Sequence, residues 1–304
     1  MTDSTGTVAI TGGTGFVGRH VMKRLLNDNY KVRALVRNAS RLSVSDPRIT
    51  PIHGDLFDDG AITRLVRNVD AVIHIVGIIM ECPNRGQTFE RVHALGTQRL
   101  LAAAKEAGVK RWIHMSALGA RPAANSNYHR TKWQGEQAVR ESGLDYTIFR
   151  PSIIHGYDGE FMQMVKSFWC DFAPPFVPYF GKDTAGKLQP VWVEDVATVF
   201  FGALTNTKSI GETYPVGGPD QYTWPHLYST CRQYFDGARD KRIVAIPVPI
   251  ARFMARMPGA PFNDDQVTMS QENSVCDTSK LETDFCITAT AFETALAGYA
   301  STIE

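Results

Sequence analysis

Three side chains of this 304-residue chain have the types and the order that carbonyl chemistry requires. Tyr128 and Lys132 are four positions apart in a helical pattern, so both project from one face of a helix. At that spacing the Lys132 ammonium is expected to lower the pKa of the Tyr128 phenol and to hold a ribose hydroxyl, which makes the tyrosine a proton donor or acceptor near neutral pH. Ser116 follows an apolar run and is expected to hydrogen-bond the same substrate oxygen. These three residues are the predicted catalytic set.

A glycine-rich turn near the start of the chain predicts a site for a pyrophosphate. Residues 11–18 read Thr-Gly-Gly-Thr-Gly-Phe-Val-Gly and fit both Gly-x-x-Gly-x-x-Gly and Gly-x-Gly-x-x-Gly. Glycine is needed because backbone N–H groups must approach the phosphates at a helix N-terminus, where a side chain would clash. The turn lies between an expected strand and an expected helix, which is the context in which such a motif binds a dinucleotide.

The residues after the second expected strand favour NADP(H) over NAD(H). An acidic residue at this place would accept a hydrogen bond from the ribose 2′-hydroxyl of NAD. This chain has Arg37 and Asn38 instead, with Arg33 and Arg41 nearby, and a guanidinium pairs well with the additional 2′-phosphate of NADP. The alternative is that these arginines form only a solvated face. Asp55, after the third expected strand, is placed either to accept from the adenine amino group or to cap a helix.

The elements that must position these residues follow from the alternation of apolar runs with helical patterns. Strands are expected over residues 7–10, 32–36, 49–52, 71–76, 112–115 and 146–149. Helices are expected over residues 89–107 and 127–141, and a helix over 193–204 with a strand near 212–216 is expected to return to the same sheet. This order predicts an α/β fold, a doubly wound parallel sheet of the Rossmann type with a smaller, mostly C-terminal substrate-binding portion.

The composition changes after Pro151, which predicts the domain boundary. The dinucleotide-binding domain is expected to span residues 1–151 plus about 187–218, and the substrate- or partner-binding portion about 152–186 plus 219–304. Residues 157–180 hold 8 aromatic side chains in 24 positions, against 10% for the chain. They indicate an ordinary core, a lid or cleft for a large apolar substrate, or a docking face toward a protein or membrane. Residues 249–257, apolar with two arginines, favour the docking face slightly.

Composition and charge exclude several classes of function. The formal net charge is +1, with 43% hydrophobic and 21% charged residues, so a nucleic-acid partner is not expected. Five cysteines without a Cys-x-x-Cys pair and eight histidines without a metal-ligand spacing predict reduced thiols and no metal site. His74, His93, His114 and His129 are expected to be hydrogen-bonded structural residues. The longest uncharged apolar run, residues 72–80, is too short to span a membrane, and no secretion signal is recognised, so a cytoplasmic protein without a transmembrane segment is expected.

Together, these motifs resemble the short-chain dehydrogenase/reductase superfamily. The resemblance is carried by residues 11–18, Gly54-Asp55-Leu56, Met115-Ser116-Ala117, Tyr128-x-x-x-Lys132 and Arg150-Pro151-Ser152. Residues 108–120, 130–136, 189–197 and 217–219 are similar to the atypical branch that contains the NADPH-binding accessory subunit of respiratory complex I and its bacterial relatives. The likeness covers most of the chain to about Tyr222.

The resemblance implies that the nucleotide domain binds NADP(H), with the nicotinamide near the catalytic set and the turn at 151–154. With the residues derived above, it gives the expected cofactor-binding set: Gly12, Gly13, Thr14, Gly15, Phe16, Val17, Arg37, Asp55, Leu56, Val76, Gly77, Tyr128, Lys132, Pro151 and Ile153. His93 stands where extended families usually carry Asn, which suggests a relay or a water anchor. Ala117 and Leu118 replace the acidic pair that sugar-nucleotide 4,6-dehydratases need for elimination of water, so the resemblance excludes dehydration. Epimerisation is possible but less expected than simple carbonyl reduction.

Three functions remain open at this point. The first is NADP-dependent reduction of a carbonyl or quinone-like small molecule, with an apolar substrate as one option, in which Tyr128 is the general acid. The second is a non-catalytic NADPH-binding assembly or stability subunit of a complex I-like membrane complex, which would place the chain peripherally at the inner membrane. The third is a sensor of the NADPH/NADP ratio.

Overall fold

The chain divides into two compact units. Unit 1 comprises Met1–Arg150, Glu194–Pro215 and Ser279–Ile287, and unit 2 comprises Pro151–Val193, Val216–Thr278 and Thr288–Glu304. The structure is a computed structural model that describes residues 5–42, 44–171, 174–182, 186–257 and 260–303.

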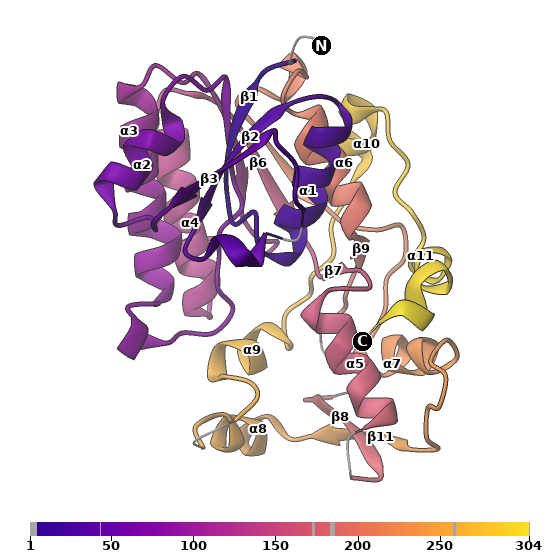
Figure 1. Cartoon of the computed structure of the whole chain (residues 1–304). Helices are drawn as coiled ribbons and strands as arrows, with labels where there is room; N and C mark the ends of the chain where they lie inside the picture. The colour runs from indigo at the N-terminus through magenta and orange to yellow at the C-terminus, as the bar shows by residue number, and fades with distance from the viewer. Residues whose placement is uncertain (1–4, 43, 172–173, 183–185, 258–259, 304) are drawn as a thin grey trace. The chain divides into compact units, whose positions relative to one another are not determined.

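A seven-stranded sheet forms the centre of unit 1 (Figure 1). Its strands are β1 (Thr7–Thr11), β2 (Lys31–Val36), β3 (Ile49–His53), β4 (Ala71–His74), β5 (Arg111–Met115), β6 (Asp145–Pro151) and β10 (Glu212–Val216). Their order is β10-β6-β5-β4-β1-β2-β3, and the five pairs from β6 to β3 are parallel. The chain therefore winds outward from β1 in both directions, which confirms the predicted doubly wound α/β sheet.

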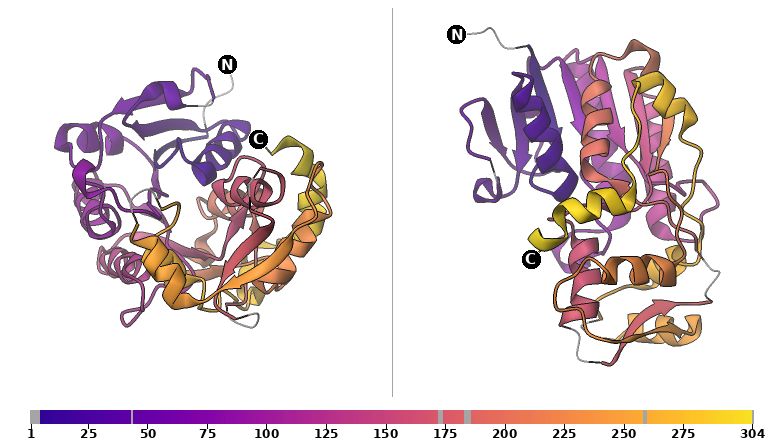
Figure 2. Two further views of the ribbon diagram at one scale, coloured as in Figure 1. Left: turned by 90° about the horizontal axis from the view of Figure 1, so that it is seen from below. Right: turned by 90° about the vertical axis from the view of Figure 1, so that its right-hand side faces the viewer.

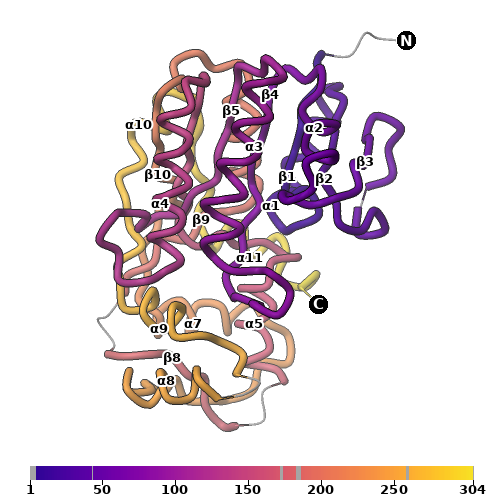
Figure 3. Tube along the Cα trace, turned by 90° about the vertical axis from the view of Figure 1, so that its left-hand side faces the viewer, coloured from indigo at the N-terminus to yellow at the C-terminus, as the bar shows by residue number. Residues whose placement is uncertain are grey.

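Helices cover both faces of this sheet. They are α1 (Phe16–Asn27), α2 (Asp59–Val66), α3 (Gly96–Glu106), α4 (Asn127–Arg140), α6 (Val193–Gly202) and α10 (Ser279–Phe285). Figures 1 and 3 show α2, α3 and α4 together on one face, with α1 and α6 on the other. On the first face, Leu65, Leu100 and Val139 of the helices pack in one cluster with Val72 and Trp112 of the strands. All five side chains are fully buried. Burial of these apolar side chains from both layers holds the strand ends in register.

Unit 2 is built from shorter elements. They are β7 (Ile154–His155), β8 (Phe176–Phe180), β9 (Val191–Trp192), β11 (Arg242–Ile246), α5 (Glu160–Cys170), α7 (Trp224–Arg232), α8 (Val248–Ala255), α9 (Asp264–Met269) and α11 (Phe292–Tyr299). Two small parallel pairs, β8 with β11 and β7 with β9, replace a large sheet, and Figure 2 shows β8 and β11 side by side. Thr223 caps α7 by accepting from the His226 N–H, with a proline in the first turn, as the sequence predicts.

The aromatic-rich stretch of unit 2 mainly fills its core. Trp169 and Tyr179 are buried, and Phe161 and Phe168 pack against the same cluster. Tyr157 is exposed, and Phe172 lies outside the described residues. The structure therefore favours the ordinary core among the three interpretations of residues 157–180, because most of these rings are consumed by packing.

Two segments differ from the sequence predictions. The helix expected over 89–107 begins with a π-helical turn, Glu90–Leu95, before α3. Ser279–Ile287, grouped by sequence with the C-terminal portion, packs in unit 1, where the Asp284 carboxylate accepts from the Tyr214 hydroxyl at 2.7 Å and the Asp284 carbonyl accepts from Asn206 Nδ2 at 2.9 Å. No helix in the described part of the chain is long and apolar enough to cross a membrane.

Candidate active site

The predicted site residues of unit 1 gather at the carboxyl edge of its parallel strands. Thr11 pairs with Leu35 on one side and with His74 on the other, so β1, β2 and β4 end together. Met115 of β5 pairs with Phe149 of β6 one position further along. The glycine turn, Arg37, Val76, Gly77 and Ser116 each follow one of these strand ends. In open α/β sheets, this edge is where ligands bind.

The glycine turn is shaped by the contacts of its own backbone. Gly12 has φ +78°, and a Cβ atom there would lie 2.8 Å from Val76 N. A Cβ on Gly18 would lie 2.1 Å from the Gly12 carbonyl oxygen, and one on Gly13 would lie 2.9 Å from Met22 Sδ. Packing against backbone therefore requires glycine at positions 12 and 18, whereas at position 13 the flexible end of Met22 could shift, and the close approach at Gly12 places Val76 directly beside the turn.

Gly15 is different, because nothing inside the protein demands a glycine there. It is exposed, its φ of −83° suits any residue, and a Cβ would approach only the Gly12 carbonyl oxygen, at 3.2 Å. Gly15 is also the N-cap of α1, where no side chain caps the helix and the first turn has no acidic residue. The N–H groups of Phe16 and Val17 thus begin a helix whose positive dipole end is left for an outside anion. This arrangement fits the pyrophosphate of a dinucleotide.

Thr14 completes the turn through its backbone, since its carbonyl oxygen accepts from Arg19 Nη1 at 3.3 Å. On the neighbouring strand, Arg37 is exposed just beyond the end of β2 and has no ion pair or hydrogen bond to the described residues. Arg33 is already engaged, because it donates to the carbonyl oxygens of Arg64 and Arg67 near the end of α2. Arg37 and Arg41 both have exposed guanidinium groups without a partner among the described residues, and Arg37 is the one directly after β2.

Asp55 does not cap a helix. Its carboxylate accepts from the Phe57 N–H at 2.7 Å in a local turn, and α2 is capped by Asp58 instead. Asp55 itself is exposed, which leaves its second carboxylate oxygen accessible. The next residue, Leu56, is buried against Gly96, where a Cβ would come within 2.6 Å of Leu56 Cδ1.

Lys132 joins three parts of the predicted site. Lys132 is 3% exposed, and its ammonium donates to the Met115 carbonyl oxygen at 3.0 Å, one residue before Ser116. It also lies 3.1 Å from the position of a Cβ on Gly77. Ser116 is 1% exposed, and its hydroxyl has no hydrogen-bond partner among the described residues. A buried hydroxyl without a partner is costly, so this one is suited to a substrate oxygen.

The electrostatics of the pair on α4 differ from the sequence expectation. Burial raises the pKa of Tyr128 to about 12, whereas the sequence predicted a pKa lowered by Lys132. Burial also lowers the pKa of Lys132 to about 8, partly offset by the carboxylate of Glu136. The physical reason is that spacing along a helix ignores the loss of water around both groups. Tyr128 is therefore a protonated phenol at neutral pH, which is the state that a general acid needs.

His93, on the π-helical turn, packs against Tyr128. The two rings are 5.3 Å apart and perpendicular, and His93 Nε2 accepts from the Ile78 N–H at 3.1 Å. Because Nε2 accepts, the proton is on Nδ1, which donates to Thr131 Oγ1 at 3.0 Å. Burial and the charge of Lys132 hold the pKa of His93 well below its usual value. His93 is thus a neutral residue that ties the segment after β4 to α4.

Two further buried histidines lie behind this layer. His74 is fully hydrogen-bonded: it accepts from Thr11 Oγ1 at 2.7 Å and donates to Thr97 Oγ1 at 3.0 Å, since the Thr97 hydroxyl donates to the His93 carbonyl. His114 stacks on His74 with ring centres 5.4 Å apart, but neither of its ring nitrogens has a partner among the described residues. The expectation that all of these histidines are hydrogen-bonded is therefore wrong for His114.

Glu136 is a supporting residue that sequence reasoning missed. It is fully buried on α4 and accepts two hydrogen bonds from Arg150, at 2.8 and 2.6 Å, and one from Arg140 at 2.8 Å. The available signal was its spacing, since Tyr128, Lys132 and Glu136 recur every four residues on one helix face. The paired carboxylate fixes the face of α4 that carries the two candidate catalytic groups.

The remaining predicted residues, Pro151 and Ile153, belong to unit 2, and Pro151 is the last residue of β6. There the Ile153 carbonyl oxygen accepts from the Val191 N–H at 2.9 Å, which extends the β7–β9 pair. Among the described residues, no group of three or more His, Cys, Asp and Glu side chains could hold a metal ion.

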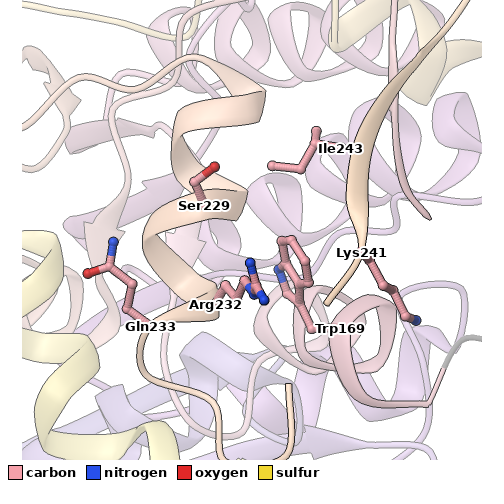
Figure 4. A pocket seen from close by; sticks show the side chains of 6 residues that line it. All are labelled: Trp169, Ser229, Arg232, Gln233, Lys241 and Ile243. Carbon is pink, nitrogen blue, oxygen red and sulfur yellow. The ribbon is translucent and has the colours of Figure 1, made fainter. Parts of the chain in front are cut away.

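A cavity of about 500 Å³ in unit 2 contains none of the predicted site residues. Figure 4 shows its lining: Trp169, Ser229, Arg232, Gln233, Lys241 and Ile243. Its cationic groups are already engaged in structural contacts. Arg232 lies over the Trp169 ring and pairs with Asp240, and Lys241 donates to the Phe168 carbonyl oxygen. This cavity is therefore not the candidate active site.

Two protein families match this chain. A family described as NAD(P)H-binding matches residues 12–164, and one described as RmlD substrate binding domain matches residues 119–304. Among solved structures, MoeE5 in complex with UDP-glucuronic acid and NAD has a TM-score of 0.78 at 19% identity, with 98% of both chains covered. At that identity the likeness shows the fold alone.

Two curated relatives are similar over most of this chain. The mitochondrial NADH dehydrogenase [ubiquinone] 1 alpha subcomplex subunit 9 of Arabidopsis thaliana is 30% identical over 81% of this chain. The matched region covers only 61% of that protein's own length. Ceramide reductase of Caulobacter vibrioides is 33% identical over 82% of this chain and 76% of its own length. The chain therefore belongs to the short-chain dehydrogenase/reductase superfamily, in its NAD(P)-binding atypical or extended branch.

Proposed function

We propose that this chain is an NADPH-dependent reductase that converts a carbonyl group of an apolar small molecule into an alcohol. The observation that carries the proposal is the Ser116 hydroxyl, which is buried, unpartnered and next in sequence to the carbonyl that holds Lys132. A purely structural serine at this place would have a partner, since buried hydroxyls normally do.

The residues of unit 1 supply every group that the reaction needs apart from the hydride, which bound NADPH supplies. Tyr128 holds the proton that the carbonyl oxygen takes up as the new C–H bond forms, and its raised pKa keeps that proton in place until then. Ser116 donates a hydrogen bond to the same oxygen and stabilises its developing charge. Lys132, fixed at the Met115 carbonyl, binds the nicotinamide ribose.

The preference for NADP(H) rests on Arg37. Its exposed guanidinium follows β2, beside the glycine turn that follows β1, and the two strands are adjacent and in register. No carboxylate occupies the end of β2, so a 2′-phosphate meets an arginine rather than a like charge.

An apolar substrate is proposed from similarity. The Caulobacter vibrioides relative, which is similar over 76% of its own length, is named a ceramide reductase, and ceramides are lipids. The test is NADPH consumption by the purified full chain with long-chain ketones, 3-keto lipids, quinones and polar sugars. Tyr128→Phe is the blank, because it removes the proton and leaves the ring and its packing.

Turnover with an apolar carbonyl that falls by at least about 100-fold in Tyr128→Phe, with NADPH affinity within about twofold, is the expected result. Turnover that survives in the variant contradicts the role of Tyr128. Turnover restricted to polar sugars contradicts the substrate class.

A second function is favoured by a specific observation. The Arabidopsis relative is a subunit of NADH dehydrogenase by name, and a tightly held nucleotide can stabilise a fold without reacting. In this alternative the chain is a non-catalytic NADPH-binding assembly subunit at the inner membrane. NADPH binding that raises the melting temperature, together with no turnover on any substrate and co-purification with a membrane complex, would establish it.

A further inference from the structure

Helix α8 of unit 2 exposes an unusual amount of apolar surface. Ile250, Phe253, Met254 and Met257 are 51%, 70%, 41% and 54% exposed. Ile250, Phe253 and Met254 are at i, i+3 and i+4 of α8, so they share one face of the helix, and Met257 follows two residues after the helix ends at Ala255. Together these four side chains are termed the apolar stripe. Ala251, on another face, is fully buried. The helix thus packs inward through a small residue and presents its largest apolar side chains to the outside.

The segment that contains α8 is basic, although Asp240 precedes it and Asp264 and Asp265 follow it. Residues 241–263 contain Lys241, Arg242, Arg252 and Arg256 and no Asp or Glu, in a chain with 32 basic and 31 acidic residues overall. Arg252 lies 3.7 Å from the Asp264 carboxylate of α9. Arg242 and Arg256 are exposed and form no ion pair with the described residues. Arg252 lies on a face of α8 away from Ile250 and Met254, whereas Arg256 is the C-cap residue of the helix and lies between Met254 and Met257 in sequence.

Of the neighbouring elements, β11 adds an exposed apolar residue, whereas α9 begins with Asp264 and Asp265. β11 leads directly into α8, and its Val244 is 37% exposed. Figures 1 and 3 show α8 beside α9 at the end of unit 2 that also carries β8. The apolar stripe contains no hydrogen-bonding side chain that a protein partner could use for specificity. Bulky apolar side chains beside arginines are the composition of helices that lie in a lipid interface.

From this geometry we infer that α8 docks unit 2 onto an anionic lipid surface. The stripe of Ile250, Phe253, Met254 and Met257 enters the region between headgroups and acyl chains, and Arg242 and Arg256 pair with lipid phosphates. The inference does not depend on the proposed reductase activity, since none of these residues belongs to the candidate active site.

The test is sedimentation of the full chain with vesicles of phosphatidylcholine alone and with about 30 mol% phosphatidylglycerol, at about 0.1 M and about 0.5 M salt. We expect binding to the anionic vesicles that weakens at the higher salt. Phe253→Asp is expected to weaken it at least about tenfold, because a large apolar side chain is no longer buried. Arg256→Glu is expected to weaken it about fivefold or more.

The matched control is Ile210→Asp, which places the same charge at an exposed apolar position of unit 1, 39% exposed in the wild type. It is expected to bind as the wild type does. In a second measurement, the emission of Phe253→Trp is expected to be quenched by brominated lipid chains, relative to the unsubstituted chain. Circular dichroism confirms that each variant is folded.

Absence of binding to anionic vesicles overturns the inference, as does equal binding by Phe253→Asp. Self-association of the chain in solution without lipid, removed by Phe253→Asp, also overturns it, because the stripe would then be covered by a second copy.

Discussion

Replacing Lys132 by methionine tests the burial of its ammonium through the pH dependence of stability. Burial lowers the pKa of Lys132 from its usual 10.5 to about 8. Since one pH unit corresponds to about 1.4 kcal/mol, folding carries a penalty of about 3 kcal/mol while the lysine is charged in both states. Below pH 8 this penalty is complete. Between pH 8 and pH 10.5 the folded chain releases the proton first, so the wild type gains about 3 kcal/mol of unfolding free energy that Lys132→Met cannot gain.

The measurement is urea unfolding of both proteins without cofactor at several values between pH 7 and pH 10.5. The unfolding free energy of Lys132→Met minus that of the wild type should fall by about 3 kcal/mol across this range. The lost hydrogen bond to the Met115 carbonyl shifts the whole curve but does not alter its slope with pH. Lys105→Met, at an exposed position of α3, is the matched control and should show a constant difference.

A difference that stays constant within about 1 kcal/mol for Lys132→Met would refute the reasoning. The ammonium would then be as well hydrated in the folded chain as in the unfolded one, and it could not lie buried between Met115 and Gly77.

Three further predictions concern single residues of unit 1. Gly18→Ala should lower the melting temperature strongly, because its Cβ would overlap the Gly12 carbonyl oxygen at 2.1 Å. Gly15→Ala should melt as the wild type does but bind NADPH weakly in a fluorescence titration. Equal melting temperatures for the two variants would contradict this expectation. Arg37→Gln should raise the Kd for NADPH by roughly 10- to 100-fold and leave that for NADH unchanged, and an equal loss for both would remove the assigned role. Glu136→Gln should cost about 3–5 kcal/mol in urea unfolding because it leaves Arg150 without its buried charge partner, and a loss below about 1 kcal/mol would show that the pair is dispensable.

Much of unit 1 could be predicted because its signals are local. Strand runs separated by helix-length segments specify a parallel sheet, and the glycine turn between the first strand and helix specifies where an anion can bind. The π-helical turn at 90–95 could not be predicted, since its hydrophobic pattern is that of an ordinary helix and the difference is a single widened turn. The lack of hydrogen-bond partners at His114 could not be predicted either, because the surroundings of its ring are set by strands far away in sequence.

The sequence by itself determined the class of sheet, the nucleotide turn and the candidate set Ser116, Tyr128 and Lys132, because residue type and spacing along the chain carry that information. The tertiary structure decided the pKa values of Tyr128 and Lys132. Burial raises the pKa of Tyr128 and lowers that of Lys132, because the stability of a charge depends on the water and partners around it, and these are set by residues far away in sequence.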